Sequence, residues 1–215
     1  MKKLFLIVTL LFISTSVLVA QDAQKAKKLL SEVSEKVKSY DNIQIEFRYT
    51  LKNLKENVNQ ESRGEVILQG EKYLVELMGA TQMYDGKKLY VIVPSDEEVT
   101  ISSVNPDDED SITPSSMLRF YEKGYTYKWD IVQNVQGRSI QYVELKPTDP
   151  KSDIKDILLG IDSQTKHIYK LIQRQKNGTE VTITIQSFKT NQPLPTNQFV
   201  FDQNRYKGYY INKLD

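Results

Sequence analysis

Side chains that commonly carry out enzyme chemistry are scarce in this chain. It has no cysteine and a single histidine, His167, which lies in a strand-like stretch between Lys166 and Ile168. Carboxylates gather at residues 105–110 (NPDDED), but this loop lacks the spaced ligands and the turn glycine of a calcium site. Phosphate-binding glycine loops, a Gly-x-Ser-x-Gly elbow and an HExxH helix are missing as well. We therefore expect a protein that is not an enzyme and that holds no metal and no cofactor.

The first twenty residues have the composition of a secretory signal peptide. Two lysines precede an apolar run from Leu4 to Val19, and Ala20 offers a cleavage site. The run is short for a membrane span, and a polar chain follows it at once. Removal of residues 1–20 takes away two of the 29 basic residues, which leaves 27 against 28 acidic ones and a net charge of −1. We expect an exported single domain, residues 21–215, without a nucleic-acid partner.

Residues 43–52 (IQIEFRYTLK) alternate between apolar and polar side chains without error. Ile43, Ile45, Phe47, Tyr49 and Leu51 fall on one face, and the polar residues between them fall on the other. This period of two is typical of a strand that is wet on one side only. The sequence therefore poses the question of what covers the apolar side.

One long helix and eleven or twelve short strands account for most of the remaining pattern. Apolar residues recur at helical spacing from Ala26 to Tyr40, which predicts an amphipathic helix of about five turns. Turn residues then divide the chain into hairpins of an antiparallel meander, with Asn177-Gly178 as the strongest hairpin signal. The predicted strands are 43–52, 64–69, 72–78, 83–85, 88–93, 98–104, 125–132, 139–145, 154–161, 167–175, 181–188 and 199–201.

A short apolar segment separates the two groups of strands. Residues 113–116 (TPSS) form a helix-start signal in front of Met117, Leu118, Phe120 and Tyr121, and a glycine ends the segment. These four side chains cannot all face one narrow stripe of a helix. The helix either caps the core or forms a lid whose side chains contact a ligand part of the time.

The predicted helices are too small to cover the apolar face of the predicted sheet. Eleven strands at ~4.8 Å spacing span about 50 Å, whereas one packed helix covers a band of ~10 Å. Curling into an open barrel would reduce the gap and leave an apolar cavity, while two sheets packed face to face would need none. The long helix favours the curved sheet. Where alternation is clean, the cavity residues would be Ile45, Phe47, Tyr49, Tyr73, Val75, Leu77, Leu89, Val91 and Trp129.

The order of several motifs resembles the outer-membrane lipoprotein carrier family, LolA, over nearly the whole mature chain. The motifs are IQIEFRYT, GEVILQGEKYLVEL, MYDGKKLYVIVPSDEEVTI, TPSSMLRF and LPTNQFVFDQNRYKGYYI. The resemblance implies an α+β fold in which one antiparallel, strongly curved sheet of about 11 strands, an incomplete β-barrel, is closed by an N-terminal helix and a short lid helix. It implies a periplasmic monomer whose cavity binds the acyl chains of lipoproteins. Its partners would be an inner-membrane exporter and an outer-membrane acceptor.

The LolA resemblance also suggests a residue that would act as a latch for the lid. Family members often carry an arginine that holds the lid over the empty cavity, and the resemblance places that position at Gln69 or Gly70. A latch formed by Gln69 would be weaker because it carries no charge.

Two other functions compete with that of a lipoprotein carrier. They are a periplasmic module of the same fold that senses lipoproteins, and a carrier of other lipids.

Overall fold

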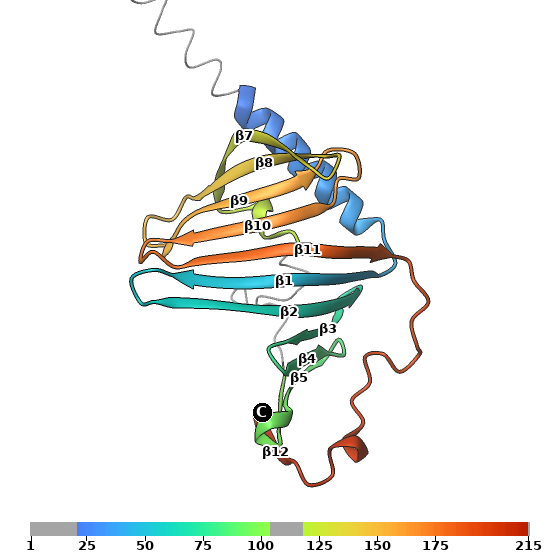
Figure 1. Ribbon diagram of the computed structural model, residues 1–215. Helices are drawn as coiled ribbons and strands as arrows, with labels where there is room; N and C mark the ends of the chain where they lie inside the picture. The colour runs from blue at the N-terminus through green and yellow to red at the C-terminus, as the bar shows by residue number, and fades with distance from the viewer. Residues whose placement is uncertain (1–20, 104–117, 215) are drawn as a thin grey trace, which may run out of the picture.

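The computed structural model describes residues 21–103 and 118–214, and all twelve of its strands belong to one sheet. The strands alternate with short turns along the chain, so most neighbours in sequence are also neighbours in the sheet (Figure 1). Their bounds are β1 Ile43–Asn53, β2 Val58–Gln69, β3 Lys72–Leu77, β4 Ala80–Tyr84, β5 Lys88–Val93, β6 Glu98–Ser103, β7 Tyr125–Val135, β8 Arg138–Pro147, β9 Ile154–Asp162, β10 Ile168–Gln175, β11 Glu180–Thr190 and β12 Tyr210–Leu214.

The sheet is curved and unclosed. Its strand order is β12-β6-β5-β4-β3-β2-β1-β11-β10-β9-β8-β7, so β12 and β7 form the two edges. The pairs are antiparallel except β12 with β6, which is parallel. The ladder between β1 and β11 joins the two meanders at the centre, from Ile43 opposite Thr190 to Lys52 opposite Glu180. One continuous sheet excludes the two-sheet sandwich that the sequence left open.

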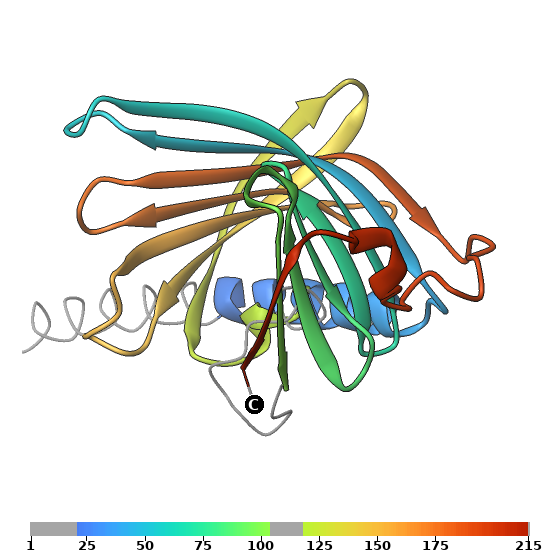
Figure 2. The same ribbon diagram turned by 90° about the horizontal axis from the view of Figure 1, so that it is seen from below.

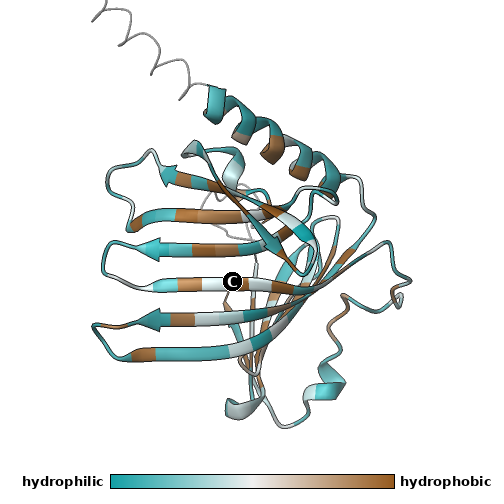
Figure 3. Cartoon of the chain, turned by 45° about the horizontal axis from the view of Figure 1, so that its top comes forward, coloured by the Kyte–Doolittle hydropathy of each residue, from teal (hydrophilic) through white to brown (hydrophobic). Residues whose placement is uncertain are grey.

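A helix covers part of the concave side of the sheet. It occupies residues 21–38 of the described chain and lies across the opening of the curled sheet (Figure 2). Leu29, Leu30 and Val33 are buried on its inner side, where they pack on the apolar inner face of β8, β9 and β10. Figure 3 shows the corresponding apolar bands alternating with polar ones along the helix and the strands. The apolar stripe that the sequence predicted is thus the surface through which the helix contacts the sheet.

The convex side of the sheet is covered over β4, β5 and β6 by the end of the chain. Strand β5 is apolar on both faces, and its outward-facing Tyr90 and Ile92 are buried. Phe201 stacks on Tyr90 with ring centroids 4.6 Å apart, and Tyr206 stacks on Phe201 at 5.3 Å. This aromatic cluster holds the 3-10 turn Gln203–Tyr206 against the sheet and delivers the chain to β12.

Several predicted elements differ from the observed ones. Strand β2 begins at Val58, six residues earlier than predicted, because β1 continues to pair with it through a polar stretch. Residues 199–201 were predicted as a strand, but they lie in turn and coil, while the last strand is β12. The first part of the predicted second helix, residues 113–117, lies outside the described residues. Its described part is a turn at 118–119 followed by a single 3-10 turn, Phe120–Glu122.

Candidate functional site

An apolar hollow of about 380 Å³ lies between the inner face of the sheet and the segment that follows the undescribed residues. Among the described residues of its wall, only Tyr49 and Gln82 bring a hydroxyl or an amide group. The lining residues are Ile45, Phe47, Tyr49, Val66, Leu68, Val75, Leu77, Met78, Ala80, Gln82, Leu118, Phe120, Ile168, Leu171, Ile183 and Ile185. Such a wall offers an apolar guest a place away from water and provides almost no group for chemistry on it.

Strand alternation and pairing register bring these side chains together. Phe47 lies opposite Gly64 on β2 and Ile185 on β11, so all three positions face the interior. A β-bulge interrupts the β1–β11 ladder at this point, because Ser187 is opposite Glu46 but Ile185 is opposite Phe47. Gly64 leaves room for the Phe47 ring, since a Cβ at Gly64 would lie 2.4 Å from Phe47 Cζ. The floor of the hollow therefore depends on one aromatic ring lying over one glycine.

The cavity residues expected from the sequence divide into two groups. Five of them line the hollow, namely Ile45, Phe47, Tyr49, Val75 and Leu77. Tyr73 and Leu89 belong to the same core cluster as Ile45 and Phe47 but do not line the hollow, and Trp129 packs against the cluster under the helix. Val91 lines none of the hollows described for this protein.

Trp129 shows why the sequence pattern predicted more wall residues than line the hollow. This residue does face inward, but it lies on β7, where the helix already covers the sheet. Other lining residues escaped the prediction. Met78 belongs to the β3–β4 turn and Ala80 begins β4. Ile168 and Leu171 lie on β10, where a register shift breaks the alternation.

The segment 118–123 is anchored beside the hollow by a buried tyrosine. Leu118 and Phe120 line the hollow, whereas Tyr121 is fully buried among residues of the helix cluster. Ser34 Oγ donates to the Tyr121 hydroxyl at 3.2 Å, and the Tyr127 hydroxyl donates to the Tyr121 carbonyl at 2.8 Å. Burial raises the pKa of Tyr121 to about 12, so the hydroxyl stays protonated. Among the predicted lid residues, Tyr121 thus differs in position from Leu118 and Phe120, and Met117 lies outside the described residues.

The single histidine links the end of the helix to the central strands. His167 Nε2 and the Tyr40 hydroxyl are hydrogen-bonded at 2.8 Å, and the imidazole stacks on Phe188 with centroids 4.0 Å apart. Burial is the main cause that lowers the pKa of His167 below its usual value of 6.5. The charge of Lys36 lowers it further, and Asp162 opposes both. These contacts give His167 a packing role at the junction of helix and sheet.

The comparisons with known proteins agree with this architecture. A family model described as "Outer membrane lipoprotein carrier protein LolA" matches residues 38–202, which is well over half of the 215 residues. The chain belongs to the LolA family. A search of curated proteins finds no match.

Two solved structures of low sequence identity share the fold of this chain, and a third matches it with a lower TM-score. An uncharacterized conserved protein from Thermus thermophilus is 11% identical, with a TM-score of 0.58 over 88% of this chain and 99% of the other. LprF from Mycobacterium bovis is 13% identical, with a TM-score of 0.51 over 81% of this chain and 98% of the other. A LolA superfamily protein from Nitrosomonas europaea is 14% identical, with a TM-score of 0.43 over 82% and 97%.

The latch position inferred from the LolA family needs correction. Gln69 is the last residue of β2 and lies opposite Lys72, on the convex side, because the inward positions of β2 are even-numbered. It is exposed and lines a separate hollow with Leu194 and Phe199 of the C-terminal segment. From there its amide is on the wrong side of the sheet to hold the segment 118–123. Arg119 of that segment lines a hollow of about 240 Å³ together with residues 70 and 71.

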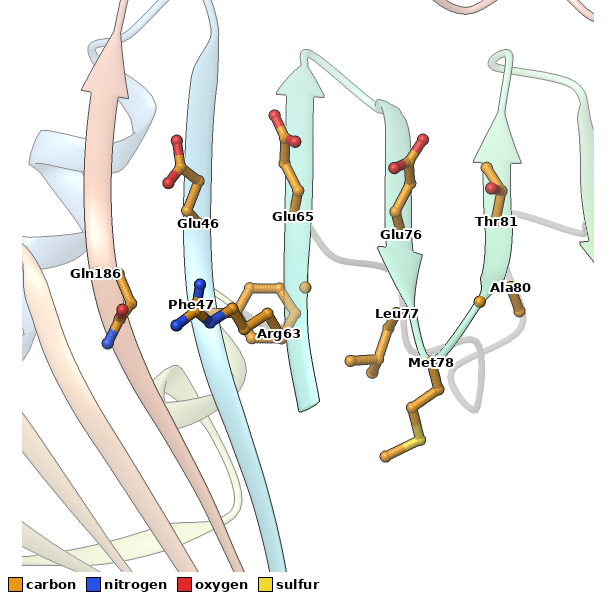
Figure 4. Close-up of a pocket in the computed structure, with 12 residues that line it drawn as sticks. Glu46, Phe47, Arg63, Glu65, Glu76, Leu77, Met78, Ala80, Thr81 and Gln186 are labelled. Atoms are coloured by element: carbon orange, nitrogen blue, oxygen red, sulfur yellow. The ribbon is translucent and has the colours of Figure 1, made fainter. Parts of the chain in front are cut away.

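A second hollow of about 510 Å³ lies on the convex side of this LolA-family sheet, at the end of the β3–β4 hairpin (Figure 4). It shares Phe47, Leu77, Met78 and Ala80 with the apolar hollow. Its outer wall carries Glu46, Glu65, Glu76, Thr81, Arg63 and Gln186. The two hollows therefore adjoin beside Gly64, one apolar and one acidic.

The described part of this family member contains neither a metal cluster nor a membrane-spanning helix. Residues 21–103 and 118–214 hold no group of three or more His, Cys, Asp or Glu side chains placed to bind a metal. Within the same ranges, no helix combines the length and the apolar character needed to cross a membrane.

Proposed function

We propose that this protein is a periplasmic carrier that binds the acyl chains of lipoproteins in the apolar hollow. The observation that carries this proposal is the hollow itself, whose wall comes from six strands and from Leu118 and Phe120. A volume of about 380 Å³ falls within the ~300–1,000 Å³ typical of small-ligand pockets. Membership in the LolA family supports lipoproteins as the source of the chains.

The energetics of the proposal rest on apolar burial. Each buried CH₂ is worth ~0.8 kcal/mol, so one long acyl chain gains on the order of 10 kcal/mol. Hydrogen bonds that hold a loop over the hollow contribute about 1 kcal/mol each, so a guest can displace such a loop. A bilayer offers an acyl chain a similar gain, and release into the next membrane therefore requires the closed, empty carrier to compete with the loaded one.

In this mechanism, residues 118–120 act as a lid that moves while Tyr121 stays fixed, and the expected lid residues 114–117 lie outside the described residues. The anchoring contacts of Tyr121 with Ser34 and Tyr127 support a fixed end, and Leu118 and Phe120 supply the part that touches the guest. An exporter in the inner membrane would load the carrier, and an acceptor in the outer membrane would receive the lipoprotein. The protein would act as a monomer during transfer.

The decisive experiment places a charge in the hollow. Phe47→Glu and Leu118→Glu should abolish binding of a purified acylated lipoprotein while the circular dichroism spectrum stays that of the folded sheet, because a carboxylate buried among apolar side chains is costly. Ile131→Glu is the matched control, since Ile131 is an exposed apolar residue on β7 and lies outside the hollow. Full binding by both folded hollow variants would contradict the proposal.

Mass spectrometry of molecules that co-purify with the protein distinguishes the competing functions. Lipoproteins are expected for the carrier. Free lipids alone would favour the lipid-binding alternative, and a stoichiometric protein partner without acyl chains would favour the sensing alternative.

A further inference from the structure

Part of β2 has a strand neighbour on one side only. The ladder with β1 covers β2 from Val58 opposite Asn53 to Leu68 opposite Ile43. The ladder with β3 begins only at Gly64 opposite Leu77. Within the described chain, residues 58–63 therefore form a free edge inside the sheet, and Figure 1 shows the β1–β2 hairpin extending beyond β3 and β4. In an antiparallel strand about half of these residues point both N–H and C=O toward the open side.

This free edge lies next to the place where the two hollows adjoin. Arg63 and Gly64 line the acidic hollow, and Phe47 separates it from the apolar hollow. Leu77 and Met78, at the end of β3, belong to both walls. A molecule whose apolar part occupies the inner hollow and leaves it at this point would meet the free edge directly.

The free edge suits a peptide and does not suit a lipid chain. After Val58 its side chains are polar, namely Asn59, Gln60, Glu61, Ser62 and Arg63. Burial of methylene groups against them would gain little, whereas an extended polypeptide can pair with the open backbone groups as an added strand. Six residues at ~3.3 Å each offer about 20 Å of edge, enough for a segment of five or six residues.

The negative charge of the acidic hollow indicates which kind of peptide would bind. Glu46 lies opposite Glu65, and Glu65 lies opposite Glu76, so three carboxylates stand side by side on β1, β2 and β3 (Figure 4). Like charges directly across strands destabilise a sheet. Glu46 is 3.9 Å from the ammonium group of Lys189, whereas Glu65 and Glu76 form no ion pair within the described residues. A basic side chain on an added strand would complement this row.

We propose that the edge 58–63 of β2 binds, as an added antiparallel strand, the extended peptide that follows the acylated residue of a lipoprotein, with a preference for basic segments. The inference rests on the proposed function, because the acyl chains in the apolar hollow place that peptide at the opening beside Gly64. The sheet thus recognises the polypeptide part of the cargo as well as its lipid.

Synthetic lipopeptides test the inference separately from acyl binding. The mature protein is titrated with three ligands that share the same diacylated cysteine: a Ser-Lys₄ tail, a Ser-Glu₄ tail, and the Ser-Lys₄ tail with N-methyl groups at alternate peptide bonds. Palmitate serves as the ligand without a peptide. Loss of two or three backbone hydrogen bonds should weaken binding of the N-methylated ligand about ten- to hundredfold. The Ser-Glu₄ tail should also bind more weakly than Ser-Lys₄, and palmitate should bind through the acyl site without any contribution from the edge.

Two protein readouts locate the effect. Hydrogen exchange should show new protection of the amides in residues 58–63 with Ser-Lys₄ and none with palmitate. The double variant Glu65→Gln/Glu76→Gln should reduce the preference for Ser-Lys₄ over Ser-Glu₄. Its matched control, Glu71→Gln, changes an exposed carboxylate on the β2–β3 turn outside the acidic hollow and should leave the preference intact.

The outcomes separate the two proposals. Binding of all acylated ligands with no effect of N-methylation, tail charge or β2 protection would overturn the peptide site and leave the carrier proposal standing. Failure of palmitate and all lipopeptides to bind would overturn the carrier proposal and the peptide site with it. Protection of residues 58–63 that depends on protein concentration without ligand would assign the edge to a second copy of the chain and would also overturn the inference.

Discussion

Adding one methyl group at Gly64 tests whether the Phe47 ring is held by its contact with this glycine. In Gly64→Ala the new Cβ would lie 2.4 Å from Phe47 Cζ, 2.8 Å from Phe47 Cε2 and 2.9 Å from the carbonyl oxygen of Glu76. Contacts of this kind are too short for carbon, so something must move. The Glu76 carbonyl belongs to a strand of the β2–β3 ladder, which leaves the ring as the more movable partner.

The expected cost follows from the overpacking of a filled core. Inserting a methyl group into such a site costs about 1–3 kcal/mol. For a domain of this length each kcal/mol lowers the melting temperature by roughly 2–4 °C, so Gly64→Ala should melt about 2–12 °C lower than the wild type. The displaced ring would also occupy part of the apolar hollow, and the affinity for an acylated ligand should fall.

Urea denaturation of a double-mutant cycle isolates the cause. Phe47→Leu removes the ring atoms that clash, so Gly64→Ala should cost about 1 kcal/mol less in the Phe47→Leu background than in the wild type. Ser62→Ala, two residues earlier on the same face of β2, removes an atom and adds none, and it should change stability by no more than about 0.5 kcal/mol. Equal costs of Gly64→Ala in both backgrounds, with unchanged m-values, would refute the role assigned to the ring.

Three further changes probe the contacts around the hollow. Tyr121→Phe leaves the Ser34 hydroxyl without its acceptor and should lower the free energy of unfolding by about 1–3 kcal/mol, measured by urea titration; a loss below ~0.5 kcal/mol would contradict the anchor. Burial keeps the pKa of His167 below that of the unfolded chain, so the unfolded state takes up the proton first as the pH falls. The stability of the protein should therefore decrease below about pH 6.5 and should not depend on His167 above it. Melting curves of His167→Gln should lack this part of the pH dependence. Phe201→Leu loses the stack on Tyr90 and a second aromatic neighbour, each worth ~0.5–1.5 kcal/mol, so thermal unfolding should show a loss of about 1–3 kcal/mol, and an unchanged midpoint would show that the C-terminal cluster adds no stability.

The sequence predicted those parts of the fold in which one face of an element is buried. Residues 43–52 alternate cleanly because β1 lies at the centre of the sheet with its inner face on the core, and the structure assigns its odd-numbered residues to that face. The helix was equally predictable from the sequence, because its apolar stripe packs on one surface of the sheet. The curvature followed from the shortage of helical cover and from the family resemblance, because no local pattern encodes it.

The parts of the fold that the sequence did not predict correctly also have physical reasons. Residues 58–63 of β2 carry no apolar face because nothing described packs on them, so alternation could not reveal a strand. The continuous apolar run in β5 was a usable signal that both faces of this strand are covered, and the C-terminal aromatics are the cover on the outer one. Gln69 was assigned to the lid by family position alone, and counting alternate residues along β2 would have placed it outside.

In the candidate site, alternation identified wall residues but could not set the limits of the hollow. Phe47 and Val75 line it as expected, whereas Trp129 shares their inward direction and packs elsewhere, because the position of the helix decides which part of the sheet stays uncovered. That position depends on long-range contacts. The β3–β4 turn residue Met78 contributes to the wall although it is half exposed, which no periodic pattern signals.

The central pairing of β1 with β11 has a consequence for how the chain reaches this state. Hairpins on either side can form early from residues close in sequence, but Ile43 meets Thr190 only after nearly the whole polypeptide has been released. Until then the two halves of the sheet are separate, and each has an exposed apolar face and an unpaired edge strand that can pair wrongly. A chain that ends before β11 should therefore aggregate instead of folding as a smaller version of the protein.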